Sequence, residues 1–238
     1  MRWAPDYPDG TATISQLLSH VSPAGGYKYD SSRFGALSGV VDQCAARPYS
    51  SLMAEQLFDR LGMSSSIPGV ALLDTSSPDR RWFSSSTLER YASIARQRAV
   101  SYKIDSRVQP IRSDASSAPM SAGTGVISTV RDLARFDAAL GDGVLLAPGT
   151  LNRAWANAGA TPTGLGWFVQ RYNGERVVWH FGLTRDANSA LIVKLPDRGL
   201  TLILLANSDG LAGPPYNLAD GSVTSNLFAN LFLRLFLG

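Results

Sequence analysis

The chain has 238 residues, 45% of them hydrophobic and 17% charged, a composition typical of a folded globular protein and unlike that of a disordered chain. Its formal net charge is only +3, and its 19 arginines are scattered rather than gathered in the basic stripe of a nucleic-acid-binding protein, so we expect no nucleic-acid partner. A single cysteine, Cys44, excludes an internal disulfide, and with only His20 and His180 as further soft ligands we expect no Cys/His metal site.

The first half of the chain has the pattern of helices separated by loops. The opening residues, MRWAPDYPDG, contain no apolar stretch, which predicts a loop and no signal peptide there. Apolar residues spaced three and four apart then predict amphipathic helices, which cover 12–20, 33–46, 50–63 and 86–99. Gly62 is placed as the C-terminal stop of the third of these helices. The rest of 74–120 is rich in Ser, Asp, Arg and Pro and predicts excursion loops.

A further helix is predicted over 128–140, where Thr129 and Asp132 have the spacing of a capping box and precede an apolar stripe. We assign Asp132 and its neighbour Arg131 to a helix cap and a solvated face rather than to catalysis. A shorter helix is predicted over 149–158.

After residue 163 the pattern changes to that of strands. Four apolar runs predict strands, which cover 165–172, 175–181, 189–196 and 200–208. Asn173-Gly174 joins the first two runs and is a strong signal for a two-residue hairpin turn. The second pair is joined through 197–199, so the sequence predicts an antiparallel meander.

The last segment, 222–237, is predicted to be a packed amphipathic helix. Arg234 interrupts its apolar run, which is also shorter than the roughly 20 residues that cross a bilayer, so we expect no membrane span. Together these elements predict an α/β fold of the α+β type, in which an antiparallel sheet is flanked by helices. We expect one domain over 1–238, with a mostly helical lobe over 12–160 and the strands and C-terminal helix over 161–238.

Familiar catalytic motifs are absent from the sequence. It contains no G-x-S-x-G nucleophile elbow, no complete dinucleotide fingerprint and no phosphate loop. His180, between Trp179 and Phe181 at the end of an apolar run, leaves a Ser-His-Asp hydrolase open as one hypothesis. His20, on the first short helix, is assigned a structural role.

Two tripeptides point to a specific family. Tyr-Asp-Ser at 29–31 stands just before a predicted helix, and His-Phe-Gly at 180–182 ends a predicted strand. In order, separation and context they resemble the Tyr-x-Asn and Lys/His-x-Gly motifs of the serine β-lactamase and penicillin-binding protein family. The likeness is to the branch of class C β-lactamases, DD-peptidases and related esterases. The intervening segments 48–63 and 125–136 also match, and the resemblance runs over nearly the whole chain.

The resemblance implies roles for five residues. Tyr29 would transfer the proton of a catalytic serine, and His180 would line the cleft beside it and bind the polar tail of the substrate. Ser31 would take the place of the family's Asn, although its hydroxyl reaches less far. Gly182 would let the substrate approach the backbone, and the amide of Leu183 would donate one hydrogen bond to the oxyanion.

One departure from the family pattern is large. The family nucleophile is the serine of Ser-x-x-Lys, and no Ser-x-x-Lys occurs in the 238 residues. The first 20 residues resemble the family segment that follows the nucleophile helix, so we expect an N-terminally truncated, β-lactamase/transpeptidase-like domain. Removal of a central helix and two strands should leave an exposed apolar surface.

We therefore expect a bacterial serine hydrolase of an ester or amide that works through an acyl-enzyme, without metal or cofactor. The substrate would be a small ester, a β-lactam or a D-alanyl peptide, and the missing N-terminal segment could be a partner as a separate chain. The alternatives are an incomplete chain that only binds a ligand or partner, and the unrelated Ser-His-Asp hydrolase. The family generally works in the periplasm or outside the cell, whereas the sequence itself leaves the localisation open.

Overall fold

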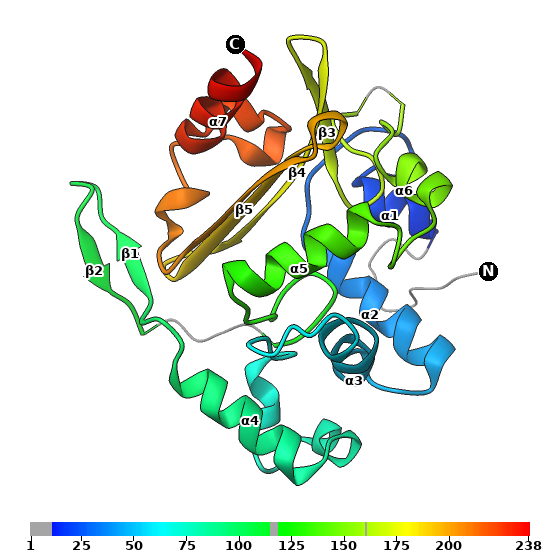
Figure 1. Ribbon diagram of the computed structural model, residues 1–238, viewed down its shortest axis with the longest axis vertical. Coiled ribbons are helices and arrows are strands. Elements are labelled where there is room, and N and C mark those ends of the chain that lie inside the picture. The colour runs from blue at the N-terminus through cyan, green and yellow to red at the C-terminus, as the bar shows by residue number, and fades with distance from the viewer. Residues whose placement is uncertain (1–10, 115–118, 160) are drawn as a thin grey trace.

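The structure is a computed structural model that describes residues 11–114, 119–159 and 161–238 (Figure 1). The loop predicted for residues 1–10 lies outside this part. Within it, no helix combines the length and the apolar character that a membrane crossing requires.

The main sheet is a four-stranded antiparallel meander in the order β3-β4-β5-β6. Its strands are β3 Phe168–Tyr172, β4 Glu175–Thr184, β5 Asn188–Leu195 and β6 Leu200–Ala206. Asn173 and Gly174 turn the chain between β3 and β4 with φ of 47° and 82°, and two positive φ angles define the type I′ turn that this dipeptide favours. Both predicted hairpins are confirmed.

The α-helices of the described residues fall where the apolar periodicity predicts them. They are α1 Ile14–Ser19, α2 Ser32–Ala45, α3 Tyr49–Met53, α4 Ser85–Arg96, α5 Val130–Gly141, α6 Pro148–Ala154 and α7 Leu227–Leu237. The third predicted helix continues past α3 as a π-helical turn, Ala54–Asp59. The last helix begins five residues later than predicted, because the side chain of Asn226 accepts the amides of Phe228 and Ala229 and caps α7 there.

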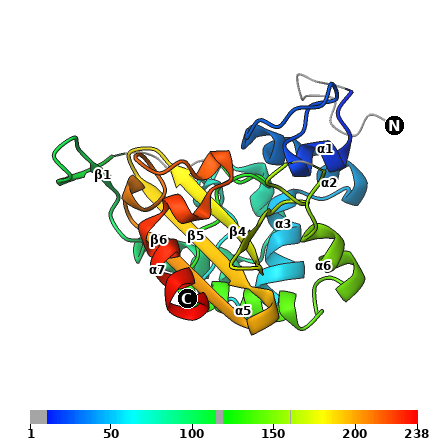
Figure 2. The same cartoon turned by 90° about the horizontal axis from the view of Figure 1, so that it is seen from above.

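Helices cover both faces of the sheet, with α7 on one face and α5 on the other (Figures 1 and 2). On the α7 side, buried residues such as Trp179, Leu191 and Val193 pack with Ala229 and Leu233. On the other side, a smaller core joins α5, α6 and β4, and contains Leu140, Leu151, Ala154, Trp155 and Val178. The mixed α/β fold class with helices flanking an antiparallel sheet is confirmed.

The outer face of α7 is apolar and exposed. Leu227, Leu231 and Leu235 lie four residues apart, and 55%, 54% and 76% of their surface is accessible. These three side chains form a single stripe that no described residue covers.

A second, two-stranded sheet was not predicted. Its strands, β1 Tyr102–Ile104 and β2 Pro110–Arg112, form a hairpin that projects from the body of the protein (Figure 1). The amide of Tyr102 donates to the carbonyl of Asn207 at 2.7 Å, and that of Ile104 donates to Asp209 Oδ1 at 3.0 Å. Three-residue strands are too short to show a period, and these tertiary contacts fix them instead.

Arg131 is exposed, as predicted, but the Asp132 side chain is buried and does not complete the predicted capping box. Thr129 does cap α5 by accepting the Asp132 amide, but the Asp132 carboxylate is only 1% exposed. Its Oδ2 accepts the amide of Ser65 at 2.8 Å and the hydroxyl of Ser66 at 2.9 Å, while Oδ1 pairs with Arg135 at 2.7 Å. Asp132 therefore ties α5 to the turn after the π-helix, because a buried charge needs such partners.

Candidate active site

Tyr29 lies in the irregular segment between α1 and α2. The backbone on both sides of it is bound to one residue. The amide of Lys28 donates to the carbonyl of His20 at 3.0 Å, and the amide of Asp30 donates to His20 Nδ1 at 3.2 Å. The Asp30 carboxylate then accepts the amide and the hydroxyl of Ser32 at 2.9 and 2.6 Å and starts α2. These bonds fix Tyr29 at the entrance to α2.

His180 lies on β4, opposite Ile192 of β5. Its Nδ1 is 2.7 Å from the carbonyl oxygen of Phe181. A carbonyl can only accept, so the neutral imidazole has its proton on Nδ1 and keeps Nε2 as an acceptor. A Ser-His-Asp triad needs a carboxylate that accepts a hydrogen bond from the histidine. Among the described residues, no carboxylate forms a hydrogen bond with His180.

The structure brings the two predicted catalytic side chains together. The ring centroids of Tyr29 and His180 are 6.4 Å apart, although 150 residues separate them in the chain. His20 lies closer still to Tyr29, at 4.6 Å between centroids. We call Tyr29, the two histidines and the rings that contact any of these three the aromatic cluster; its members are His20, Tyr29, Phe34, Phe168, His180 and Phe181.

The presence of His20 in the aromatic cluster is the feature that sequence reasoning missed. Both histidines of the chain therefore lie beside the one tyrosine at the entrance to α2. His20 follows α1 directly and has a positive φ of 55°, a geometry that helix periodicity does not reveal. Its placement depends on the hydrogen bonds to residues 28 and 30.

Burial sets the protonation of these three rings. Burial, followed by the charges of His180 and Arg33, lowers the pKa of His20 to about 4. Burial also lowers the pKa of His180 to about 4. For the phenol, burial and then the negative charge of Asp30 raise the pKa of Tyr29 to about 12. At neutral pH the cluster thus contains two neutral imidazoles and an un-ionised phenol.

The other predicted site residues lie close to Tyr29 or His180 in the chain but are not bound to either. Ser31 is the exposed N-cap residue of α2, and its hydroxyl does not bond the helix. Gly182 is exposed on β4, and a Cβ there would meet only the Ala190 side chain, at 3.7 Å. Leu183 is half-buried opposite Ser189. Among the described residues, no hydrogen bond or ring contact joins these three to Tyr29 or His180, so their roles stay predictions.

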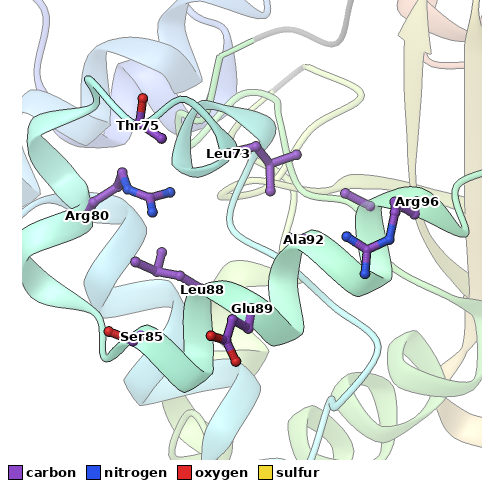
Figure 3. A pocket seen from close by; sticks show the side chains of 9 residues that line it. Leu73, Thr75, Arg80, Ser85, Leu88, Glu89, Ala92 and Arg96 are labelled. Carbon is purple, nitrogen blue, oxygen red and sulfur yellow. The ribbon is translucent and has the colours of Figure 1, made fainter.

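Neither a group of potential metal ligands nor the pocket described here indicates a different active site. The described ranges contain no group of three or more His, Cys, Asp or Glu side chains that could hold a metal ion. A pocket of about 550 Å³ lies between α4 and the 3₁₀ turns before it, lined by residues such as Leu73, Arg80 and Arg96 (Figure 3). None of the aromatic cluster lines it.

The sequence matches the model of one known protein family over most of its length. The family model described as Beta-lactamase matches residues 2–220. No curated protein matches the sequence.

Solved structures share the fold at low sequence identity. The octameric penicillin-binding protein homologue from Pyrococcus abyssi is 15% identical, with a TM-score of 0.63 over 90% of this chain and 44% of that one. The D-amino acid amidase from Ochrobactrum anthropi SV3 is 19% identical, with a TM-score of 0.63 over 99% of this chain and 76% of that one. The D-alanine carboxypeptidase AmpC from Burkholderia cenocepacia is 18% identical, with a TM-score of 0.63 over 94% of this chain and 71% of that one.

The chain spans only part of the length of these relatives. It covers 44% of the Pyrococcus protein and 53% of a penicillin-binding protein from Bacillus halodurans. The likeness establishes the β-lactamase/transpeptidase fold.

Proposed function

The chain belongs to the β-lactamase family, and from this premise we propose that it supplies the tyrosine–histidine side of a serine hydrolase active site. The observation that supports this proposal is the convergence of Tyr29 and His180, 6.4 Å apart between ring centroids, on segments 150 residues apart. The reaction would be acyl transfer from an ester or amide to a serine, followed by transfer of the acyl group to water.

In this reaction Tyr29 would move the proton. Its phenolate oxygen would take the proton of the attacking serine hydroxyl, and the phenol would later give it to the leaving group. With a pKa of about 12, ionisation of Tyr29 at pH 7 costs about 7 kcal/mol, from about 1.36 kcal/mol per pH unit. A cation within about 4–6 Å lowers such a pKa by about 1–3 units. The lysine of a Ser-x-x-Lys would supply that cation, whereas the side chain of Lys28 is exposed.

The remaining predicted residues would bind the substrate. His180 presents Nε2 as an acceptor, because its Nδ1 is bound to the Phe181 carbonyl. Gly182 would allow the substrate to lie along β4, since a side chain there would project from the exposed surface of the strand. The amide of Leu183 would be one oxyanion donor, and Ser31 a polar contact at the entrance to α2.

The nucleophile would come from outside the 238 residues. A Ser-x-x-Lys segment, whether joined to this chain or supplied as a separate polypeptide, would complete the site beside Tyr29. The names of two structural neighbours, a D-amino acid amidase and a D-alanine carboxypeptidase, favour amides of D-amino acids as the first substrates to test. β-Lactams and small esters follow from the family.

A second candidate is a chain that binds a ligand or a partner without catalysis. Two observations favour it: the 238 residues contain no Ser-x-x-Lys, and the pKa of Tyr29 is raised rather than lowered. The stripe of exposed leucines on α7 would then be one surface available to a partner.

The experiment compares hydrolysis of a p-nitrophenyl ester and of D-alanine amide by this chain and by the product of any longer reading frame that adds an in-frame Ser-x-x-Lys. We expect hydrolysis by the longer product, a loss of about 10²–10⁴-fold in kcat for Tyr29→Phe, and a smaller loss for His180→Ala. Tyr172→Phe on β3 is the matched control and should stay within about twofold of the wild type, because that ring is outside the aromatic cluster. Activity that survives Tyr29→Phe and disappears in His180→Ala would support the Ser-His-Asp alternative. No turnover in either protein would support binding alone.

A further inference from the structure

His20 holds the segment that contains Tyr29 through two hydrogen bonds of different kinds. Its backbone carbonyl accepts the amide of Lys28, and its side-chain Nδ1 accepts the amide of Asp30. The two bonds bracket residue 29, so neither neighbour of the tyrosine can shift without breaking one of them. His20 can do both because it adopts φ of 55° at the end of α1, a left-handed conformation in which the helix stops.

The side chain of His20 also packs on the phenol it brackets. Its ring lies 4.6 Å from the Tyr29 centroid and 4.5 Å from that of Phe34, and His20 is only 1% exposed. Because Nδ1 accepts a hydrogen bond, the proton of the neutral ring is on Nε2. This buried Nε2–H has no partner among the described residues. A buried donor without a partner calls for an explanation, and a role in the active site is one such explanation. The donors of Tyr91, Trp155 and Trp179 are likewise buried without a partner in the described part of the chain, so the hydrogen bonds of His20 carry more of the inference than its free donor.

The tautomers of the two histidines are therefore opposite. His20 offers a donor at Nε2, and His180 offers an acceptor at Nε2, with the Tyr29 ring within 4.6 and 6.4 Å of the two imidazoles. A stabilising packing role alone would explain the ring contacts of His20. It would not explain the hydrogen bond that the side chain accepts from the amide of Asp30, next to Tyr29.

We propose that His20 is a positioning residue of the active site: it sets the location of Tyr29 through the bonds to residues 28 and 30. The effect of this positioning on catalysis rests on the proposed function, whereas the positioning itself does not.

The first test is made on the intact chain and needs no catalysis. The chain has two histidines, so a long-range ¹H–¹⁵N spectrum shows two imidazoles, and we expect one to be protonated at Nε2 and the other at Nδ1. In His20→Ala the amide of Asp30 should exchange with solvent at least about 10-fold faster, while that of Lys28 stays protected because its acceptor is backbone. In His20→Asn exchange at Asp30 should stay within about threefold of the wild type, since Asn tolerates the left-handed conformation and keeps an acceptor.

Val40→Ala on α2 is the control, because it removes buried apolar contact without touching residues 28–30. A His20 ring protonated at Nδ1 in the wild type would overturn the proposal even if His20→Ala fails to fold. Equal acceleration of exchange at residue 30 in His20→Asn, His20→Ala and Val40→Ala would also overturn it, because that result indicates general loosening.

The second test uses ester hydrolysis by the catalytically complete protein. We expect His20→Ala to lower kcat about 10-fold or more with KM within about twofold, His20→Asn to recover part of the loss, and Val40→Ala to stay within about twofold. Unchanged kcat in His20→Ala would contradict the positioning role. If the wild type does not hydrolyse the ester at all, the proposed function fails, and the exchange experiment still decides the role of His20.

Discussion

The buried imidazole of His20 should make the stability of the protein depend on pH. Its folded pKa of about 4 lies below the ordinary value of 6.5, so the unfolded chain binds more protons between these two values. The stability that depends on neutral His20 is therefore complete above about pH 6.5 and decreases as the pH falls toward 4. At pH 4.5, about 2 units below the ordinary pKa, the histidine is protonated in the unfolded chain and mostly neutral in the folded one. Protonation of His20 in the unfolded chain therefore lowers the free energy of unfolding by about 2.7 kcal/mol relative to neutral pH.

His180 should act in the same direction. Its pKa is also lowered to about 4, but its side chain is half-buried, so solvent screening makes its contribution smaller than that of His20. The carboxylates other than Asp30, which is coupled to His20, contribute in the same way to the pH dependence of both proteins. A comparison between wild type and His20→Asn therefore isolates the term of His20.

The assay is urea unfolding followed by tryptophan fluorescence at about pH 7.5 and about pH 4.5. The drop in unfolding free energy between the two pH values should be about 2–3 kcal/mol larger in the wild type than in His20→Asn. The cost of the substitution itself is present at both pH values and cancels. Equal pH dependence in the two proteins would refute the inference that His20 is buried and neutral.

Three further predictions concern the fold. Asp132→Asn should lower the unfolding free energy by about 3 kcal/mol, because it weakens the buried network that joins α5 to the turn after the π-helix. The exposed Asp142→Asn should change it by at most about 0.5 kcal/mol in urea unfolding. Gly174→Ala should cost about 1 kcal/mol in the same measurement because φ is 82° there, while Gly149→Ala, in α6 with open space around it, should be neutral or stabilising, and an equal effect at both would contradict the turn assignment. Leu235→Glu on the exposed stripe of α7 should keep the melting temperature within about 2 °C because 76% of the Leu235 surface is accessible, and a large loss of stability would show that the stripe is covered.

The elements that the sequence predicts well are those with a local physical cause. Asn173-Gly174 can take the positive φ angles of a type I′ turn, so the β3–β4 hairpin and its register follow from two residues and the alternation around them. The α5 helix follows from the Thr129 cap and the apolar stripe behind it. In these cases residues close in sequence decide the structure.

The elements that the sequence does not predict depend on contacts between distant residues. The β1–β2 hairpin exists because Tyr102 and Ile104 bond to the segment after β6. Asp132 has the spacing of a surface cap, yet residues 65 and 66 bury it, some 66 positions away in the chain. Periodicity describes one element at a time, so it cannot show which carboxylate another element will cover.

The candidate site falls between these two cases. The Tyr29 and His180 motifs could be paired by resemblance, and the structure gives the distance between them. His20 could not be found in this way, because its side chain reaches Tyr29 only after residues 28–30 fold back against the end of α1. A histidine at the end of a short helix gives no signal of that loop.

We propose that this chain supplies the tyrosine and histidine of a hydrolase site but not its nucleophile. Intact-mass spectrometry of the purified 238-residue chain after incubation with a penicillin and with an activated ester tests it most directly. We predict that the mass of the chain stays unchanged, and that the product of a reading frame extended to include Ser-x-x-Lys gains one acyl group at that serine, more slowly in Tyr29→Phe. A stable acyl adduct on a serine of the 238 residues, abolished by substitution of that serine, would contradict the claim.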